Sequence, residues 1–583
     1  MQNKYVWATE DIFQSTQEWN KTFSQVEKQL DFSKYKGKLG NAETFLTFQQ
    51  ELEKVSMVIE RLSVYAMMKH DENTKDSTAD SMNSKVHSLC AKLSANLSFV
   101  QPELTALDQN VLTSLIENPK LCDYDYYLKG ILKQKEHVLS NEEENLLAKS
   151  SEVFSSFRDV FTKIDNADLP IAKIKVDGQT IPITHGSYSV LLQNPNAEVR
   201  KKAFKKYYNS YISLINTISA TYYGNVKKDV FVAKARKYDS ALQMALSNED
   251  VPEIVYSNLL NTVNQALPTL HRYMQEKKKA LGVDEMHMYD IYVPTVANAD
   301  LKLEYDDAYK LVVEGLAPLG KDYQDLLKTA YEQRWLDVYE KEGKRSGAYS
   351  VAVYTTHPYV LLNYQKTTHD VFTIAHEMGH SLHSYFSNKS QPYAKADYTI
   401  FVAEVASTVN EVLLIKHLLK TATDNKLKKY LLSYLLEMIR TTLFRQTQFA
   451  EFEHFSHSQV EKGIPLTKDN LSKEYLKLNK KYYGNAIKHD KEIKYEWARI
   501  PHFYRAFYVY KYSTGIISAL AIADRILTEG KPAVEDYFKF LSSGGSDSPV
   551  ELLKIAGVDL TDKKPFISAF KAFENALNQF VEL

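Results

Sequence analysis

Two histidines four residues apart, with a glutamate directly after the first, are the side chains of this sequence best suited to metal chemistry. They stand in the run His376-Glu377-Met378-Gly379-His380. In a helix, residues four apart share a face with Cβ atoms about 5–6 Å apart, so both imidazoles can reach one tetrahedral Zn²⁺ through bonds of about 2 Å. Glu377 is then free to act as general base on a zinc-bound water, which is the chemistry of amide hydrolysis.

A third ligand separates a zinc site from two surface histidines. A metzincin would need glycine at position 383 and histidine at position 386, but this chain has His383 and Phe386. His383 competes as a ligand, yet it shares a helix with the first two histidines, where tetrahedral closure by three side chains is strained. We therefore expect His383 to be a packed or solvent-edge residue.

A carboxylate from the following helix offers a better third ligand. Glu404 and Glu411 are seven residues apart on one face of an otherwise apolar segment. A buried carboxylate costs several kcal/mol unless it is paired or bound to a metal. We expect Glu404 to ligate zinc and Glu411 to orient a ligand histidine, the alternative being two solvated glutamates.

A histidine and several tyrosines follow much further along the chain. His502 precedes the tyrosines at 504, 508, 510 and 512, and such groups can donate hydrogen bonds to the oxyanion that forms during attack on an amide. Tyr504, Tyr508 and Tyr512 recur at helical spacing on one predicted face. Because 40 of the 583 residues are tyrosine, an aromatic core stripe is the alternative interpretation.

These segments resemble the oligoendopeptidase F family of thimet-oligopeptidase-like zinc metallopeptidases, of the gluzincin type. The resemblance rests on three ordered segments, Thr368–His383, Glu404–Glu411 and His502–Tyr508. It extends to four further runs, Gly347-Ala-Tyr-Ser350, Pro358–Tyr364, His287–Pro294 and Gly544–Pro549. The similarity thus covers most of the chain, and ordered motifs are far more specific than the five-residue histidine motif alone.

The resemblance implies one Zn²⁺ per chain and a role for each matched residue. The implied zinc ligands are His376, His380 and Glu404, and Glu377 is the implied general base. His502 and Tyr508 match residues that stabilise the tetrahedral intermediate. Thimet-type relatives have a glycine-rich loop after the histidine, whereas residues 503–507 contain no glycine, so Tyr510 and Tyr512 stay as alternative donors. The resemblance also implies a central substrate channel between helical lobes, which admits only unstructured oligopeptides.

Length and periodicity predict a mainly α protein with two lobes. A chain of 583 residues exceeds the usual size of a single core. Asn194-Pro195-Asn196 marks a break between an N-terminal helical lobe, 1–195, and a catalytic zinc metallopeptidase domain, 196–583. Helical periodicity is clearest in 42–69, 77–109, 141–163, 197–235, 251–281 and 427–463.

Strand signals are few, and they place a small sheet beside the zinc helix. Residues 171–183 read as a β-hairpin with a turn at Asp177-Gly178. Residues 350–354 and 359–364 read as a second strand pair just before the zinc helix, which we expect over 370–386 with Thr368 or Asp370 as its N-terminal cap. The strand at 360–364 is a candidate edge on which an extended peptide can add as a further strand.

Charge and cysteine content exclude several classes of function. The 72 Lys and Arg residues balance 73 Asp and Glu residues, giving a net charge of −1, so neither nucleic acid nor a membrane is an expected partner. Two cysteines, Cys90 and Cys122, cannot supply a disulfide framework and indicate a reducing compartment. The chain start has no apolar signal region and no later stretch has 18 uninterrupted apolar residues, so we expect a cytoplasmic protein.

The sequence thus predicts a zinc-dependent endopeptidase that cleaves internal bonds of short unstructured oligopeptides, through a zinc-bound water activated by Glu377. One alternative is an exopeptidase of the dipeptidyl or carboxypeptidase type. Another is a non-catalytic zinc-containing peptide-binding protein. The carboxylate of Glu377 beside the ligands argues against a purely structural zinc, which would gain nothing from it.

Overall fold

The computed structural model describes residues 4–296, 299 and 301–583, and it is mainly α-helical. The chain forms two compact units that are interleaved in sequence. Unit 1 takes its described residues from 1–138, 300–418 and 519–558, and unit 2 from 139–299, 419–518 and 559–583. The predicted boundary at Pro195 lies within unit 2. The division into domains 1–195 and 196–583 stays a prediction.

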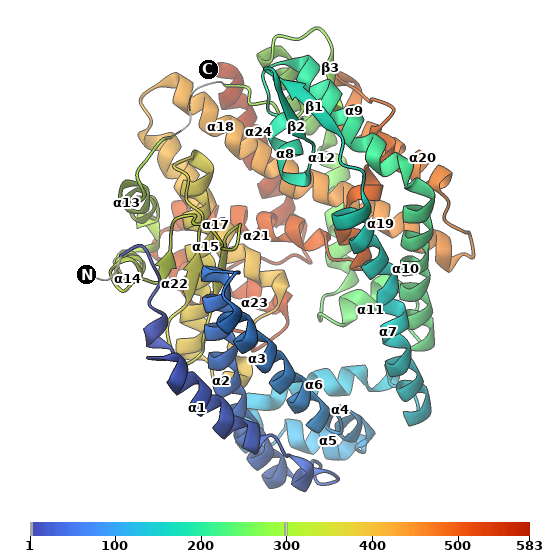
Figure 1. Ribbon diagram of the computed structural model, residues 1–583, viewed down its shortest axis with the longest axis vertical. Coiled ribbons are helices and arrows are strands. Elements are labelled where there is room, and N and C mark those ends of the chain that lie inside the picture. Colours follow the sequence, from blue (N-terminus) through green and yellow to red (C-terminus); the bar gives the residue numbers. More distant parts are fainter. Residues whose placement is uncertain (1–3, 297–298, 300) are drawn as a thin grey trace. The chain divides into compact units, whose positions relative to one another are not determined.

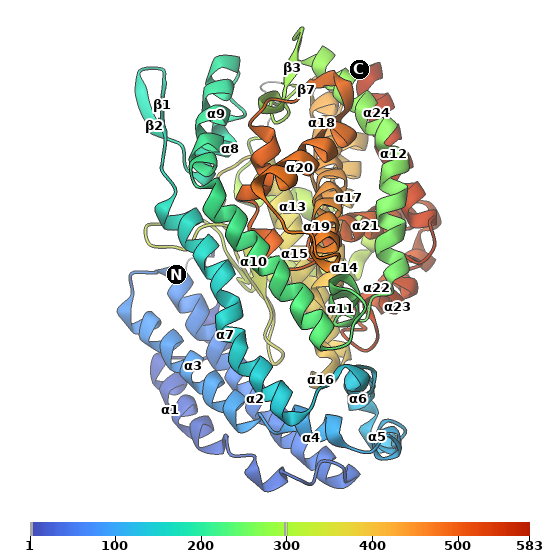
Figure 2. The same ribbon diagram turned by 90° about the vertical axis from the view of Figure 1, so that its right-hand side faces the viewer.

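Unit 1 contains the predicted zinc helix and the small sheet beside it. Its helices are α1 (Thr16–Val26), α2 (Ala42–Glu72), α3 (Ser77–Asn96), α4 (Val100–Ala106), α5 (Gln109–Ile116), α6 (Asp125–Gln134), α13 (Tyr305–Gly315), α14 (Lys321–Glu332), α15 (Thr368–Ser390), α16 (Tyr393–Ala396), α22 (Lys531–Leu541) and α23 (Pro549–Ile555). Its strands are β4 (Leu336–Asp337), β5 (Tyr349–Val351) and β6 (Tyr359–Leu361). Helices α1, α2 and α3 lie side by side (Figure 1 and Figure 2).

Unit 2 is also built mostly from helices. They are α7 (Asn141–Lys163), α8 (His185–Leu191), α9 (Ala197–Ser213), α10 (Ile215–Ala235), α11 (Ala241–Ser247), α12 (Glu253–Ala280), α18 (Asn425–Ile439), α19 (Arg445–Glu461), α20 (Lys468–Tyr483) and α24 (Lys564–Glu582). Its strands are β1 (Lys173–Val176), β2 (Gln179–Pro182), β3 (Met286–His287) and β7 (Ile487–Lys488). Two further helices, α17 (Ile400–Thr421) and α21 (Tyr510–Glu529), contribute residues to both units.

The predicted helices are present, but three of the long segments are broken. The prediction for 141–163 is confirmed by α7, whereas 77–109, 197–235 and 427–463 each contain two α-helices. Within the described residues, no helix combines the length and apolar content needed to cross a bilayer.

The predicted hairpin at 171–183 is confirmed by the antiparallel pair β1 and β2, whose register places Val176 opposite Gln179. The turn residues Asp177 and Gly178 both have positive φ, 49° and 82°. Two successive positive φ values match the right-handed twist of a hairpin, and asparagine, aspartate and glycine tolerate them best. The Asp-Gly pair therefore identified this turn correctly.

The sheet beside the zinc helix has the order β4-β6-β5. Strand β6 pairs in parallel with β4 and antiparallel with β5. The middle position of β6 corrects the prediction that the strand at 360–364 offers a free edge for a peptide, because both of its edges are already paired. Within the described residues, β5 pairs only with β6, so β5 is the strand with a free edge on this side.

The N-cap of helix α15 lies one residue before the first predicted cap, Thr368. Thr367 is its N-cap, with Oγ1 accepting a hydrogen bond from the Asp370 backbone N–H, and the Asp370 carboxylate accepts in return from the Thr367 N–H. This reciprocal capping box satisfies two backbone donors at the helix start. The predicted caps Thr368 and Asp370 are therefore residues of the first turn.

Helices α15 and α17 approach each other closely at Gly379. A Cβ atom at position 379 would lie 2.5 Å from the Ser407 Cα and 2.8 Å from the Ala406 carbonyl oxygen. A buried amide strengthens the same contact, because Asn410 Nδ2 donates to the Ala375 carbonyl at 3.0 Å. Only glycine at position 379 allows this separation of the two backbones.

We expect Gly379→Ala to lower the free energy of unfolding by about 1–3 kcal/mol, the usual range for overpacking a core. The backbone of α17 must move to admit the methyl group, so metal affinity should fall as well. Gly130→Ala in α6 is the matched control, since its Cβ would meet nothing within 4 Å and alanine favours helix by up to about 1 kcal/mol. Denaturant titration of both variants checks the expectation, and equal stability of the two would contradict it.

Candidate active site and metal centre

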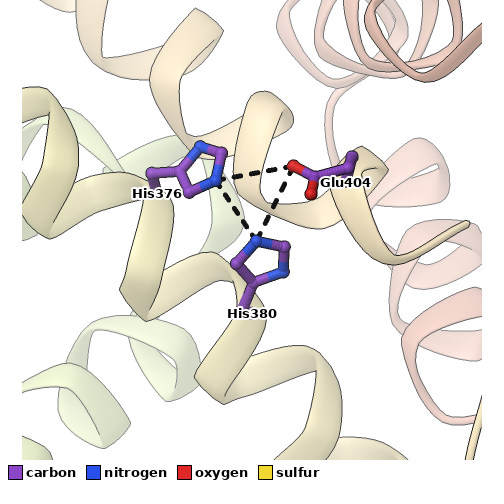
Figure 3. A group of neighbouring side chains, drawn as sticks. All are labelled: His376, His380 and Glu404. Carbon is purple, nitrogen blue, oxygen red and sulfur yellow. Dashed lines mark hydrogen bonds and ion pairs between the residues drawn. The ribbon is translucent and has the colours of Figure 1, made fainter. Parts of the chain in front are cut away.

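Two helices of unit 1 present the three predicted metal ligands to one point. His376 and His380 project from successive turns of α15, and Glu404 faces them from α17 (Figure 3). One ligand atom from each residue lies within 4.8 Å of the other two. The arrangement matches the predicted ligand set of two histidines and one carboxylate from the following helix.

The separations between the donor atoms suit a tetrahedral zinc ion. His376 Nε2 lies 3.2 Å from His380 Nε2 and 3.5 Å from Glu404 Oε2, and His380 Nε2 lies 3.8 Å from the same oxygen. Donors about 2.0–2.1 Å from a zinc ion at tetrahedral corners are separated by about 3.3 Å. The three side chains therefore fit a zinc ion with little adjustment, and the fourth corner is left for another ligand.

Glu411 orients the first histidine. Its Oε2 lies 3.2 Å from His376 Nδ1, so that ring nitrogen donates the hydrogen bond and Nε2 points its lone pair toward the other ligands. A carboxylate behind a ligand histidine fixes the tautomer in this way at many metal sites. Glu411 therefore lies where the prediction placed it: it contacts His376 from α17, seven residues after Glu404.

Charge around the two histidines favours a bound cation. Burial opposes protonation of His376, but Glu411, Glu377 and Glu404 together outweigh it and raise the pKa of His376 to about 9. Burial and the nearby charge of His376 lower the pKa of His380 to about 3. The carboxylates thus attract one positive charge to this point, and a metal ion supplies it better than a proton because it is shared by all three ligands.

Glu377 lies beside the ligand group without belonging to it. Its residue is 7% exposed, and burial raises the pKa of its carboxyl to about 7, with the Glu404 and Glu411 charges adding to the rise and His376 opposing it. The Ser350 backbone amide on β5 slightly opposes this rise in pKa. A carboxyl with a pKa near neutrality is well matched to proton transfer at physiological pH.

His383 is packed, as expected, and takes no part in the ligand group. Its ring stacks on Tyr398 with centroids 3.7 Å apart and contacts Phe540 at 5.3 Å. Burial lowers the pKa of its imidazole to about 3, so it stays neutral. The competing assignment of His383 as third ligand is not supported by this geometry.

The ligand group opens into a cavity of about 1220 Å³ within unit 1. Its walls come from α2, β5, α15 and α17 and include His376, Glu377, His380 and Glu404. Residues 348–352 of the β5 segment also line it, so the free strand edge faces the same space as the candidate metal site.

The predicted downstream donors lie in unit 2, where they form a separate cluster. His502 belongs to the 3₁₀-helix η12 (Pro501–Tyr504), Tyr508 to the following turn, and Tyr512 to the first turn of α21. The His502 and Tyr508 rings are 5.9 Å apart, the Tyr508 and Tyr512 rings 5.5 Å, and Tyr512 Oη lies 3.4 Å from His502 Nε2. Burial, with Arg445 and Arg505 adding to it, lowers the pKa of His502, so the imidazole is neutral at pH 7.

The tyrosines divide by burial rather than by helical spacing. Tyr504 and Tyr510 are only 6% and 1% exposed, and Tyr504 stacks on Phe161 while its hydroxyl hydrogen-bonds to Thr221. Tyr508 and Tyr512 are partly exposed beside His502. The prediction that Tyr504, Tyr508 and Tyr512 share one helical face is wrong, because α21 begins only at Tyr510.

Two features of this site escaped the sequence reasoning. The effect of the Ser350 backbone on Glu377 has no signal in the sequence, since any residue supplies a backbone amide. The steric role of Gly379 had a signal, because a glycine in the middle of a helix is unfavourable unless close packing requires it. That signal could be interpreted only once the structure showed that α17 packs against Gly379.

Comparison with known proteins agrees with this geometry. A sequence profile described as peptidase family M3 matches residues 190–572, and one described as oligopeptidase F matches residues 103–170. Oligopeptidase PepF of Bacillus subtilis is 45% identical, covering 99% of this chain and 87% of the relative. An oligoendopeptidase F homolog of Lactococcus lactis is 40% identical and covers 100% and 97%.

Solved structures show the same fold. A crystal structure from Chlamydophila abortus superposes with a TM-score of 0.93 at 35% identity, covering 99% of this chain and 98% of that one. Oligoendopeptidase-F from Enterococcus faecium gives 0.75 at 37% identity, covering 97% and 98%. The chain belongs to peptidase family M3 and is a metalloendopeptidase of the oligoendopeptidase F type. Its two-lobed helical zincin fold and its peptide-bond hydrolase activity follow from that membership.

Metal analysis of three variants tests the ligand assignment. Glu404→Ala should lose most of its metal after dialysis, because two histidines alone leave a tetrahedral site half formed. Glu411→Ala should bind metal about 10–100-fold more weakly, as expected for loss of the group that orients a ligand. His383→Ala is the control and should keep about one metal ion per chain. Full metal content in Glu404→Ala would show that the third ligand comes from elsewhere.

Proposed function

We propose that this protein is a zinc-dependent endopeptidase that hydrolyses internal bonds of short unstructured oligopeptides. In this proposal His376, His380 and Glu404 hold one Zn²⁺, Glu377 is the general base, and His502 and Tyr508 stabilise the transition state. The observation that carries it is the convergence of the three ligand atoms within 4.8 Å of one another, beside a buried carboxylate that ligates nothing. A structural zinc site would have no use for that carboxylate.

The catalytic roles follow from chemistry that each side chain can perform. When bound, zinc polarises the scissile carbonyl and lowers the pKa of a water molecule to about 7. Glu377 accepts the proton of the attacking water and returns it to the leaving amine.

His502 and Tyr508 are proposed as donors to the developing oxyanion. His502 is neutral at pH 7 and can donate a hydrogen bond, and the partly exposed Tyr508 hydroxyl can do the same. Preorganised donors of this kind are worth about 10²–10³-fold in kcat. Tyr512 is the remaining alternative, since it also contacts His502, whereas the buried Tyr510 is less suited to contact a substrate.

Strand β5 is the proposed docking edge for the peptide. Its free edge lines the cavity that contains the candidate metal site, and an extended chain can pair with it through main-chain hydrogen bonds. Main-chain pairing accepts most side chains, so broad sequence tolerance is expected. It also requires an extended substrate, which restricts the enzyme to unstructured peptides.

The proposal places the enzyme in the cytoplasm, acting on peptides rather than on nucleic acid or membranes. Cys90 and Cys122 are both free thiols in the structure, as a reducing compartment would keep them. The balanced net charge of −1 gives no general attraction to polyanions.

Replacing Glu377 tests the general base. Glu377→Gln should keep its metal, because the three ligands are unchanged, yet lose about 10²–10⁴-fold in turnover, because an amide cannot accept the proton. The assay uses a quenched peptide blocked at both termini, so that only internal cleavage is scored. Turnover above about a tenth of wild type would rule out Glu377 as the base, and cleavage only of peptides with a free end would indicate an exopeptidase.

Replacing single tyrosines tests the oxyanion donor. Tyr508→Phe removes only the hydroxyl, so kcat should fall by about 10²–10³-fold with little change in KM or Tm. Tyr510→Phe serves as the buried control and should keep kcat near wild type. Loss of rate in Tyr512→Phe instead would move the donor role to that residue, and unchanged rates in both Tyr508→Phe and Tyr512→Phe would remove this segment from the mechanism.

A further inference from the structure

The turn that carries Tyr508 contains a strained residue. Residues 505–509 connect η12 to α21, and Phe507 within them has a φ of +51°. This left-handed conformation is natural for glycine but unfavourable for a bulky side chain such as phenylalanine. It persists only where surrounding contacts impose it. Something must therefore hold the backbone directly before Tyr508.

A buried carboxylate makes the contact that holds it. The Phe507 backbone N–H donates to Glu453 Oε1 at 2.6 Å, and both residues are almost inaccessible to solvent, at 2% and 1% exposed. Glu453 lies in the middle of α19, and its other oxygen has no hydrogen-bond partner among the described residues. The 2.6 Å separation is at the short end of the N–H···O range, which suits a contact that must oppose strain.

The buried surroundings of Glu453 make an ionised carboxylate unfavourable at this position. Burial raises the pKa of its carboxyl to about 8, although His457, the Phe507 N–H and Lys511 oppose the rise. His457 donates from Nδ1 to the Glu453 carbonyl, while its Nε2 faces Asp229 at 3.3 Å. The His457 ring also packs on the Phe507 ring, with centroids 4.6 Å apart. Backbone and side chain of Phe507 are thus both held from α19.

Holding Phe507 determines where the next side chain points. Phe507 is buried and Tyr508 is partly exposed, so rotation of the backbone at Phe507 would swing the Tyr508 ring away from His502. We propose that Glu453 is a positioning residue for the reaction, which imposes the left-handed conformation on Phe507 and so directs Tyr508 toward the substrate. This inference rests on the role of Tyr508 in the proposed function.

The test compares substitutions of Glu453 that keep or remove the acceptor, in metal-loaded full-length protein. Glu453→Met fills a similar space without an acceptor, and kcat should fall about 10–100-fold with KM and metal content unchanged, since small misplacements of a catalytic group have such effects. Glu453→Gln keeps an oxygen for the Phe507 N–H and should stay within about threefold of wild type. Glu453→Asp keeps the carboxyl group but withdraws its oxygen by one methylene, so it should lose rate even if Glu453→Met does not fold.

A control separates positioning from a general loss of stability. Glu437 is another carboxylate of unit 2, partly buried and paired with Lys277 and Arg440 on elements that do not include the Tyr508 turn. Glu437→Gln should lower Tm while leaving kcat of the folded protein unchanged. Amide hydrogen exchange gives a readout independent of activity: the Phe507 amide should exchange at least tenfold faster in Glu453→Met and Glu453→Asp, but not in Glu437→Gln.

The double variant with Tyr508→Phe decides whether Glu453 acts through Tyr508. If it does, Glu453→Met should reduce kcat by less than about threefold in the Tyr508→Phe background, because the hydroxyl it positions is already gone. A full additional loss in that background would overturn the inference while leaving the role of Tyr508 intact. Unchanged kcat in both Glu453→Met and Glu453→Asp would also overturn it. Unchanged kcat in Tyr508→Phe alone would instead refute the proposed donor, on which the inference rests.

Discussion

The contact between α15 and α17 at Gly379 is the constraint on which the candidate metal site depends. The ligands come from two helices, and a carboxylate on α17 can meet two histidines on α15 only if the two backbones nearly touch. Glycine at 379 permits that distance, and the amide of Asn410 bonds across it to the Ala375 carbonyl. The same close approach of the two helices brings Glu411 behind His376. One helix contact therefore places both Glu404 and the carboxylate that hydrogen-bonds to His376.

An excess of negative charge explains why such a site favours a metal. Glu377, Glu404 and Glu411 surround two imidazoles in a largely buried position, and His376 is the group whose pKa rises in response. A buried charge without compensation is strongly unfavourable. A divalent cation would satisfy Glu404 and both histidines at once, with Glu411 hydrogen-bonded to His376 and Glu377 outside the ligand group. The candidate ligand and the candidate base thus belong to one cluster of carboxylates. Small differences in position give the members of this cluster different roles in the proposal.

The two compact units carry different parts of the proposed chemistry. Unit 1 contains the metal group, the base and the peptide-docking edge, while unit 2 contains the cluster of His502, Tyr508 and Tyr512. Each part is organised by its own packing: in unit 1 by the helix pair α15 and α17, in unit 2 by α19 and the strained turn at Phe507. The left-handed Phe507 also shows that this chain turns between η12 and α21 without a glycine, since residues 505–509 contain none.

Local patterns in the sequence determined the helical class and the Asp-Gly hairpin and picked out the candidate metal ligands, because spacing within a helix or turn follows from backbone geometry alone. His376 and His380 had to share a face, and Glu404 and Glu411 stood out as carboxylates in an apolar helix. Only the tertiary structure decided which strand is the free edge, that Thr367 caps α15, and which tyrosines reach the surface. Those outcomes depend on contacts between segments distant in sequence, such as Gly379 with Ser407 or Glu453 with Phe507. Local periodicity in the sequence cannot predict such contacts.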